Sequence, residues 1–170
     1  MRKSTAAIAA AIAGLAAAAV MFAGAGPAAA GARPASPAAS GTWHFQIMTT
    51  SAASTRASVV ASGLVTAGGV DVQGKSTDIF RFAGGTVKVR HSPPAGPRTF
   101  NPRTCLFTVR QHGTYKVLGG TGKYAGISGH GKYQLNILGI GAKAHGSCSK
   151  SLPPAAFQLV VDAAGPASLP

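Results

Sequence analysis

The chain has 170 residues and carries 16 lysines and arginines against three acidic residues, all of them aspartates. This length suits a single domain with a real core, and the formal net charge of +13 predicts a surface that attracts anionic partners. Because Asp71, Asp78 and Asp162 are the only carboxylate side chains, catalysis by a carboxylate pair is poorly supported. The five histidines stand in no catalytic motif, so an enzyme is the less favoured interpretation. A Ser/His/Asp triad that forms only in space stays open.

The first 30 residues have the order of a secretory signal peptide. Arg2 and Lys3 precede an uncharged, alanine-rich stretch over residues 6–22, and residues 28–30 offer an A-x-A cleavage site. The alternative is a membrane anchor, which needs about 20 strongly apolar residues. This stretch is shorter and mostly alanine, so we expect cleavage and secretion to the extracellular space. Loss of Arg2 and Lys3 would leave a net charge of about +11.

The rest of the chain divides into a leader, one domain and a tail. Residues 31–40 contain only small side chains, one arginine and two prolines, which predicts a flexible leader. We place the folded domain at residues 41–165 and a short C-terminal tail at residues 166–170. Basic residues are spread along the domain, and its few aromatic residues are not interleaved with them. Specific nucleic-acid binding is therefore not expected.

Alternation of apolar and polar residues recurs after residue 40, whereas no segment shows a sustained helical period. Gly113 interrupts the longest alternating run, where it would permit a bend or a bulge. The glycines before Asp71 predict a turn that includes this aspartate. The predicted strands cover residues 42–47, 57–66, 70–73, 79–82, 86–91, 105–117, 132–137 and 157–162.

About eight strands, each with one apolar face, predict an all-β fold. Antiparallel strands of this kind close into an eight-stranded β-barrel or stack as a β-sandwich. The alternation alone does not separate these two architectures. A barrel of this size has an interior that is filled by side chains or holds one small ligand.

Two cysteines, Cys105 and Cys148, remain in the exported chain. An even count in a secreted protein predicts a disulfide between them. The alternative is a zinc site formed with His112 and His145, but these spacings match no compact zinc-binding motif. We therefore predict the disulfide and no metal.

The segment from Gly113 to Tyr133, GTYKVLGGTGKYAGISGHGKY, is rich in glycine. It resembles the glycine-rich core of the allene oxide cyclase and dirigent-like β-barrels. Together with the turns at residues 66–71 and 82–86 and the segments 100–106 and 157–160, it is also similar to a group of secreted actinobacterial proteins of unknown function. The resemblance implies an eight-stranded antiparallel barrel, which in the plant proteins holds apolar or phenolic molecules. It implies no catalytic residue here, since no acidic residue matches a plant active site.

Residues 78–91 predict a hairpin whose register follows from its apolar residues. A two-residue turn at residues 83–84 sets Phe80 opposite Val87 and Asp78 opposite Val89, so that the core side chains share one face. A shift by one residue would mix core and solvent faces.

In this register Asp78 faces inward, and His91 lies diagonally across from it at one mouth of the barrel. One interpretation is that both residues lie beyond the strand ends and point into water. The other is that they orient the polar end of a lumen ligand, together with Tyr115 or Tyr133 from neighbouring inward faces. Asp78, His91, Tyr115 and Tyr133 are therefore the candidate ligand-binding residues.

Three functions stay open. A secreted barrel that binds a small apolar or aromatic ligand predicts a largely apolar cavity of about 300 Å³ or more. A non-catalytic envelope or matrix protein that binds anionic cell-wall polymer or anionic lipid predicts a packed lumen and salt-sensitive adhesion. A cyclase-like or dirigent-like enzyme predicts convergent lumen groups with shifted pKa values. None of the three requires a cofactor.

Overall fold

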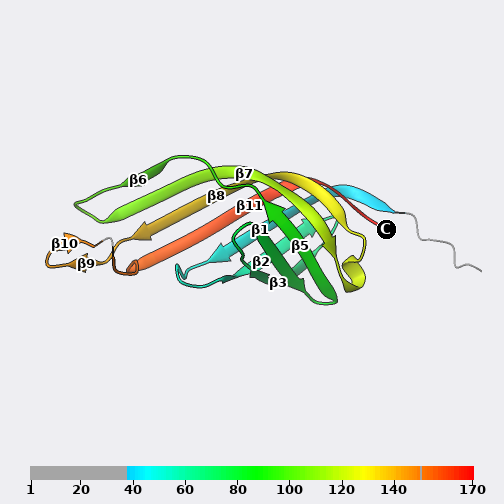
Figure 1. The fold of residues 1–170 in the computed structure, drawn as a ribbon, viewed down its shortest axis with the longest axis horizontal. Coiled ribbons are helices and arrows are strands. Elements are labelled where there is room, and N and C mark those ends of the chain that lie inside the picture. Colours follow the sequence, from blue (N-terminus) through cyan, green and yellow to red (C-terminus); the bar gives the residue numbers. More distant parts are fainter. Residues whose placement is uncertain (1–37, 150) are drawn as a thin grey trace, which may run out of the picture. The chain divides into compact units, whose positions relative to one another are not determined.

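A computed structural model describes residues 38–149 and 151–170, in which the chain forms a closed, eight-stranded antiparallel β-barrel (Figure 1). The predicted barrel is confirmed, and the sandwich alternative is wrong. The predicted signal peptide and residues 31–37 of the leader lie outside the described residues. The barrel strands are β1 (Ala39–Thr49), β2 (Arg56–Gly63), β3 (Ala67–Val72), β4 (Thr77–Phe82), β5 (Gly85–His91), β7 (Leu106–Gly120), β8 (Ser128–Ile140) and β11 (Ala156–Leu169).

The sheet runs in the order β5-β4-β3-β2-β1-β11-β8-β7 and closes because β5 also pairs with β7. All eight predicted strands are present, although the domain limits differ from those expected. Ala39 and Ser40 pair with Leu169 and Ser168. Strand β1 therefore starts inside the predicted leader, and β11 continues through the predicted tail, because each supplies the other with hydrogen-bonding partners.

Strands β7, β8 and β11 are longer than the others, and together they extend beyond the barrel (Figure 1). Strand β6 (Arg98–Phe100) pairs with the first residues of β7 on this extension. A small hairpin of β9 (Lys143–Ala144) and β10 (Ser147–Cys148) lies at its end.

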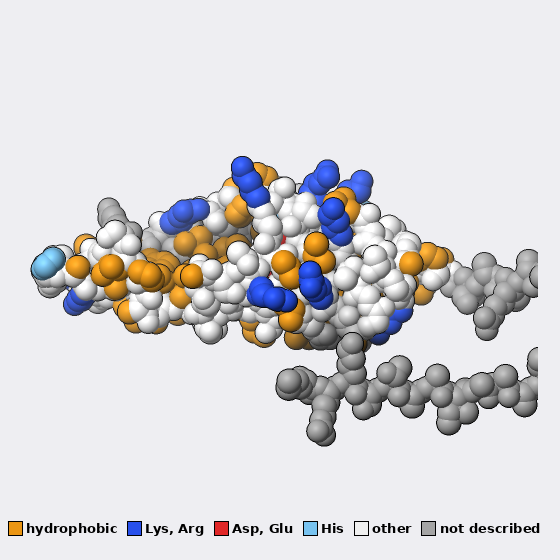
Figure 2. Space-filling model, turned by 60° about the horizontal axis from the view of Figure 1, so that its bottom comes forward, with side chains coloured by type: hydrophobic (Ala, Val, Ile, Leu, Met, Phe, Trp, Pro, Cys, Tyr) orange, Lys and Arg blue, Asp and Glu red, His pale blue; other side chains and the backbone are white. Residues whose placement is uncertain are grey.

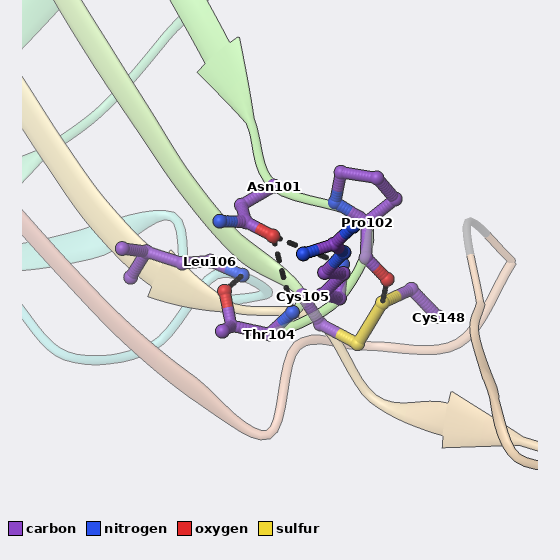
Figure 3. The surroundings of a disulfide bond; sticks show 7 residues. Asn101, Pro102, Thr104, Cys105, Leu106 and Cys148 are labelled. Atoms are coloured by element: carbon purple, nitrogen blue, oxygen red, sulfur yellow. Dashed lines mark hydrogen bonds between the residues drawn. A yellow bond between two sulfur atoms is a disulfide. The ribbon is translucent and has the colours of Figure 1, made fainter.

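The predicted disulfide is confirmed and fastens this end of the molecule (Figure 3). Cys105, just before β7, is bonded to Cys148 in β10, with 5.4 Å between their Cα atoms. The Asn101 side chain accepts hydrogen bonds from the backbone N–H groups of Arg103 and Thr104, which holds the turn that presents Cys105. Because both sulfurs are used in the bond, the zinc alternative is wrong. Such a disulfide fits a secreted protein.

The core fills the half of the barrel that lies away from the extension. Trp43, Phe45, Phe80 and Phe82 are buried there, and neighbouring rings meet edge to face or tilted, with centroids 5.0–6.2 Å apart. Each such pair adds about 0.5–1.5 kcal/mol to the effect of burial alone.

A short 3-10 helix, η1 (Gly122–Tyr124), closes this end of the barrel. Its Tyr124 is buried against Phe82, with ring centroids 5.5 Å apart. The Lys123 backbone N–H donates to the Gly84 carbonyl, which ties the helix to the β4–β5 turn. Across residues 38–149 and 151–170, the structure contains no helix that is long and apolar enough to cross a membrane.

Candidate ligand site in the barrel lumen

The β4–β5 hairpin adopts the predicted register. Phe80 pairs with Val87 and Asp78 pairs with Val89, and the turn lies at residues 83–84. Phe80 and Val87 are fully buried. Because side chains alternate along a strand, Asp78 shares the inward face with Phe80.

Asp78 and His91 meet at the open end of the lumen, opposite the end that η1 closes. His91 Nε2 lies 3.7 Å from Asp78 Oδ1, and the two side chains are only 22% and 15% exposed, respectively. The structure therefore does not match the interpretation in which both point into water. Asp78 Oδ1 also accepts a 2.9 Å hydrogen bond from the Gly74 N–H in the β3–β4 turn. Burial raises the pKa of Asp78, while the Gly74 N–H and His91 oppose that rise.

Tyr133 on β8 joins this pair from two strands away, since only β7 lies between β8 and β5. Its ring stands edge-on to the His91 ring, with centroids 6.3 Å apart, and its hydroxyl donates a 2.8 Å hydrogen bond to the Ser92 carbonyl. It pairs across the ladder with Gly113, where an added Cβ would lie 2.5 Å from the Tyr133 ring. Of the bend or bulge that Gly113 would permit, the bulge is absent, because the β7–β8 register is continuous there. This glycine makes room for the tyrosine.

Tyr115 on β7 has the mirror-image arrangement. It pairs with Gly131 on β8, where an added Cβ would lie 2.6 Å from the Tyr115 ring. Tyr115 is 4% exposed, and its hydroxyl has no hydrogen-bond partner within the described residues. Burial raises the pKa of Tyr115 to about 12, so the hydroxyl stays protonated at neutral pH.

The sequence analysis expected Asp71 in a turn, whereas the structure places it in β3, facing the lumen behind the residues that line the cavity. Asp71 pairs with Ala57 on one side and Phe80 on the other, and it is completely buried. Neither carboxylate oxygen has a hydrogen-bond partner within the part of the chain that the structure describes. Burial raises the pKa of Asp71 to about 7, and the Asp78 charge adds to this shift while the nearby Gln73 side chain opposes it.

The alternation within its own strand misplaces Asp71, and the signal that places it correctly lies in the neighbouring strand β2. Val70 and Val72 are both apolar and stand on either side of Asp71, so the pattern alone favours the valines as the inward residues. The register of β2 reverses this preference, because its inward-facing Val59 and Ala57 pair with Gly69 and Asp71. Once β2 and β3 are aligned, the aspartate must face the lumen.

A cavity of about 210 Å³ opens between these polar groups and the core. This volume is below the figure of about 300 Å³ expected for drug-sized ligands. It equals roughly seven water molecules at ~30 Å³ each, which is enough for a single-ring compound. Asp78, His91, Tyr115, Tyr133 and Gln73 supply its polar groups. Its apolar walls are formed by Phe45, Ile47, Phe80, Val89, Leu135, Leu159 and Val161.

The apolar wall of the cavity continues outward onto the extension. Leu135 pairs with Val161 at the cavity, and the next inward-facing row toward the extension consists of Val109, Ile137 and Leu159. These three side chains are half-buried. Figure 2 shows hydrophobic side chains gathered on the elongated part of the molecule, and acidic side chains are almost absent from the face drawn. We call Val109, Ile137 and Leu159 the apolar floor.

The site combines apolar walls with polar groups at one end, which is the arrangement of a binding pocket. Several lumen groups have raised pKa values, as the enzyme interpretation expects, yet Asp71 does not line the cavity. Within the described ranges, no cluster of three or more His, Cys, Asp or Glu side chains is arranged to hold a metal ion. No protein-family model, curated protein or solved structure matches the chain.

Proposed function

We propose that this protein is a secreted carrier or sensor that binds a small, largely apolar molecule in the barrel lumen. The observation that carries the proposal is the 210 Å³ cavity, whose walls are mainly aliphatic and aromatic and whose polar groups converge at the open end. Burying a single ring against such walls supplies the binding energy, at about 25 cal/mol per Å² of apolar surface. Asp78, His91, Tyr115 and Tyr133 would fix the orientation of the molecule.

The disulfide and the N-terminal sequence support export through a signal peptide. The resemblance of residues 113–133 to the allene oxide cyclase and dirigent-like barrels supports a lumen ligand of apolar or phenolic character. In the proposed carrier, no covalent step on the ligand is required.

Ligand-observed NMR with a panel of single-ring aromatic compounds tests the proposal. A Val161→Phe variant, which places a ring in the cavity, should abolish binding. Val160→Phe is the matched control, because Val160 is the neighbouring residue on β11 and faces the other side of the strand. Chemical-shift changes in the methyl groups of Val89 and Leu159 locate the bound compound without any variant. Absence of binding by every compound in the panel would overturn the proposal.

A second candidate function is adhesion to an anionic polymer, which the distribution of basic residues favours. The outer faces of β4, β5, β7 and β8 present basic side chains on adjacent strands, whereas Arg56 is the only lysine or arginine on β11, β1, β2 and β3. One flank of the barrel is therefore strongly positive. We call this set the basic flank: Arg81, Lys88, Arg90, Lys116 and Lys132.

Retention on an immobilised polyanion tests this second function. Because charges are screened beyond ~8 Å at physiological salt, retention should fall steeply as salt rises to about 0.5 M. Replacing Lys88, Arg90 and Lys116 by glutamine should weaken retention more than the same change at Arg56, Arg103 and Lys143, which removes equal charge elsewhere. Equal effects of the two triple variants would show that net charge, and not the flank, is responsible.

A further inference from the structure

The lumen holds two of the three acidic residues of a strongly basic protein. Asp71 on β3 and Asp78 on β4 both face inward. The negative charge of Asp78 contributes to the raised pKa of Asp71. The third, Asp162, lies on the outer surface, where its Oδ1 accepts a hydrogen bond from the Gln46 side chain. Two of the three acidic side chains thus face the lumen, and one of them, Asp78, lines the cavity.

These two carboxylates have no permanent cation beside them. Within the described residues, the only side chain at ion-pair distance is His91, which is 3.7 Å from Asp78. The basic residues of the same hairpin are exposed and alternate with the buried core residues, so they point away from the lumen; they are Arg81, Lys88 and Arg90. Among the described residues, the imidazole of His91 is therefore the one side chain that can supply a positive charge to these acids at ion-pair distance.

The lumen also contains buried polar atoms that have no partner. Both oxygens of Asp71 and the hydroxyl of Tyr115 make no hydrogen bond within residues 38–149 and 151–170. Tyr115 is 96% buried and lines the cavity, so its hydroxyl is available to a molecule bound there. Unpaired buried acceptors are unfavourable unless a donor reaches them.

The apolar walls add a further preference. The rings of Phe45, Phe80 and Tyr115 line the cavity, and the Tyr115 ring lies 4.9 Å from the Phe45 ring. Aromatic faces attract a cation through their quadrupole, most strongly where water is excluded. Carboxylates and aromatic faces together favour a positive group and disfavour a negative one.

Building on the proposed function, we propose that the lumen ligand is a small protonated amine with an apolar body. Its ammonium group donates hydrogen bonds to Asp78 and Tyr115 and neutralises the charge of the acidic pair, while its apolar body contacts the aliphatic walls. A carboxylate ligand of the same shape is repelled by the two aspartates. The basic exterior and the acidic lumen therefore select opposite charges.

Three compounds of nearly equal shape test the inference, namely benzylamine, benzyl alcohol and benzoate. They are titrated by NMR or calorimetry at about pH 8, where the ammonium is charged and Asp71, with a pKa of about 7, is mostly ionised. We expect benzylamine to bind at least about tenfold more tightly than benzyl alcohol, because charge-assisted hydrogen bonds are the stronger ones. Benzoate should bind most weakly. If benzyl alcohol or benzoate binds as well as benzylamine, the amine inference is wrong and the proposed function stands. If none of the three binds, the proposed function itself is in doubt.

Variants of the two lumen aspartates test whether these residues cause the preference for benzylamine. Asp78→Asn should reduce the preference for benzylamine over benzyl alcohol to about threefold or less, since one charge-assisted bond is lost. Asp162→Asn removes the same charge from the outer surface and should leave the preference unchanged. Asp71→Asn serves as a second lumen variant if Asp78→Asn does not fold. An unchanged preference in a folded lumen variant would overturn the inference.

The pH dependence gives an independent readout on the unmodified protein. Asp78, His91, Tyr115 and Tyr133 are the titratable groups that face the bound molecule, with Asp71 behind them. Benzylamine affinity should rise between about pH 5.5 and about pH 8, because Asp71, with a pKa of about 7, becomes charged while the amine remains protonated. Benzyl alcohol affinity should change little over this range. A benzylamine affinity that falls as the pH rises would contradict the assignment.

Discussion

Tyr133 and Gly113 face each other across the β7–β8 ladder, and the tyrosine ring occupies the space that a side chain at position 113 would need. Two residues along the same ladder, Tyr115 and Gly131 repeat the arrangement with the strands exchanged. Each tyrosine lies over the backbone of a glycine, which allows two large rings to enter a narrow lumen from adjacent strands. Gly113 and Gly131 therefore determine where the hydroxyl groups of the two tyrosines lie in the site.

Replacing Gly113 by alanine should destabilise the protein. The added Cβ would lie 2.5 Å from the Tyr133 ring, and overpacking of this kind costs about 1–3 kcal/mol. Gly68→Ala on β3 is the matched control, because an added Cβ there meets no atom within 4 Å. The control should be neutral or stabilising by up to about 1 kcal/mol, since alanine loses less backbone entropy than glycine on folding. Urea denaturation of both variants gives the comparison, and equal effects would mean that ring contact is not what Gly113 accommodates.

Much of this fold can be predicted from its alternation of apolar and polar residues. In the longest strand, β7, the residues of one alternating set face the lumen and the inner side of the extension. This set includes Phe107, Val109 and Tyr115. The β4–β5 register was predictable because a two-residue turn at residues 83–84 keeps Phe80 and Val87 on the same face, whereas a shift by one residue would separate them. The proximity of Asp78 and His91 follows directly from that register.

Features that depend on pairing between distant strands could not be predicted in the same way. Asp71 stands between two valines, and only its alignment with β2 makes it an inward residue. The first residue of β1 and the last residue of β11 are in strands because Ala39 and Leu169 pair with each other. Nothing in the local sequence around either residue indicates this long-range pairing. The size of the cavity depends on how the side chains pack, which no periodicity reports.

Removing the disulfide should lower stability while leaving the barrel intact. The bond joins the start of β7 to the β9–β10 hairpin at the end of the extension, with a sequence separation of 43. Loop-closure entropy predicts a loss of about 3–4 kcal/mol in the free energy of unfolding. A Cys105→Ala/Cys148→Ala double variant tests this by urea denaturation, with reduced and alkylated protein as a second preparation.

Intact-mass measurement should show no free thiol in the unreduced protein, and far-UV circular dichroism of the double variant should retain its β-sheet spectrum. Two titratable thiols in the purified protein would contradict the bond. If the double variant lost all β-structure at room temperature, the barrel would depend on the disulfide, and the prediction of an intact barrel would be wrong.

The apolar floor should make affinity depend on ligand length beyond the cavity. In a series of unbranched alkylamines, each CH₂ that contacts Val109, Ile137 or Leu159 should add up to ~0.8 kcal/mol. An Ile137→Ser variant should weaken the long members of the series and leave the short ones unchanged. The matched control is Leu138→Ser, because Leu138 is 50% exposed on the opposite face of β8. If the two variants affect long ligands equally, the tail of the ligand does not lie on the floor.

Asp71 should make the protein less stable as the pH rises. Its pKa is about 7 in the folded state against an ordinary value of 3.8, so between these values the folded state holds a proton that the unfolded state has lost. The free energy of unfolding therefore falls as the pH rises through this window, and the loss is complete above about pH 7. The cost is on the order of a few kcal/mol.

Urea denaturation at intervals from about pH 5 to about pH 8 measures this effect, with the pH range chosen to span the Asp71 titration. Asp71→Asn should show a flatter dependence and should exceed the wild type in stability at the upper end, because the neutral amide is not charged on burial. Asp162→Asn should keep the wild-type slope, since Asp162 is exposed on the outer face. A wild-type slope that Asp71→Asn leaves unchanged would mean that another group carries the dependence. An amine bound beside Asp78 should also flatten the slope, because it stabilises the charged form of the acidic pair.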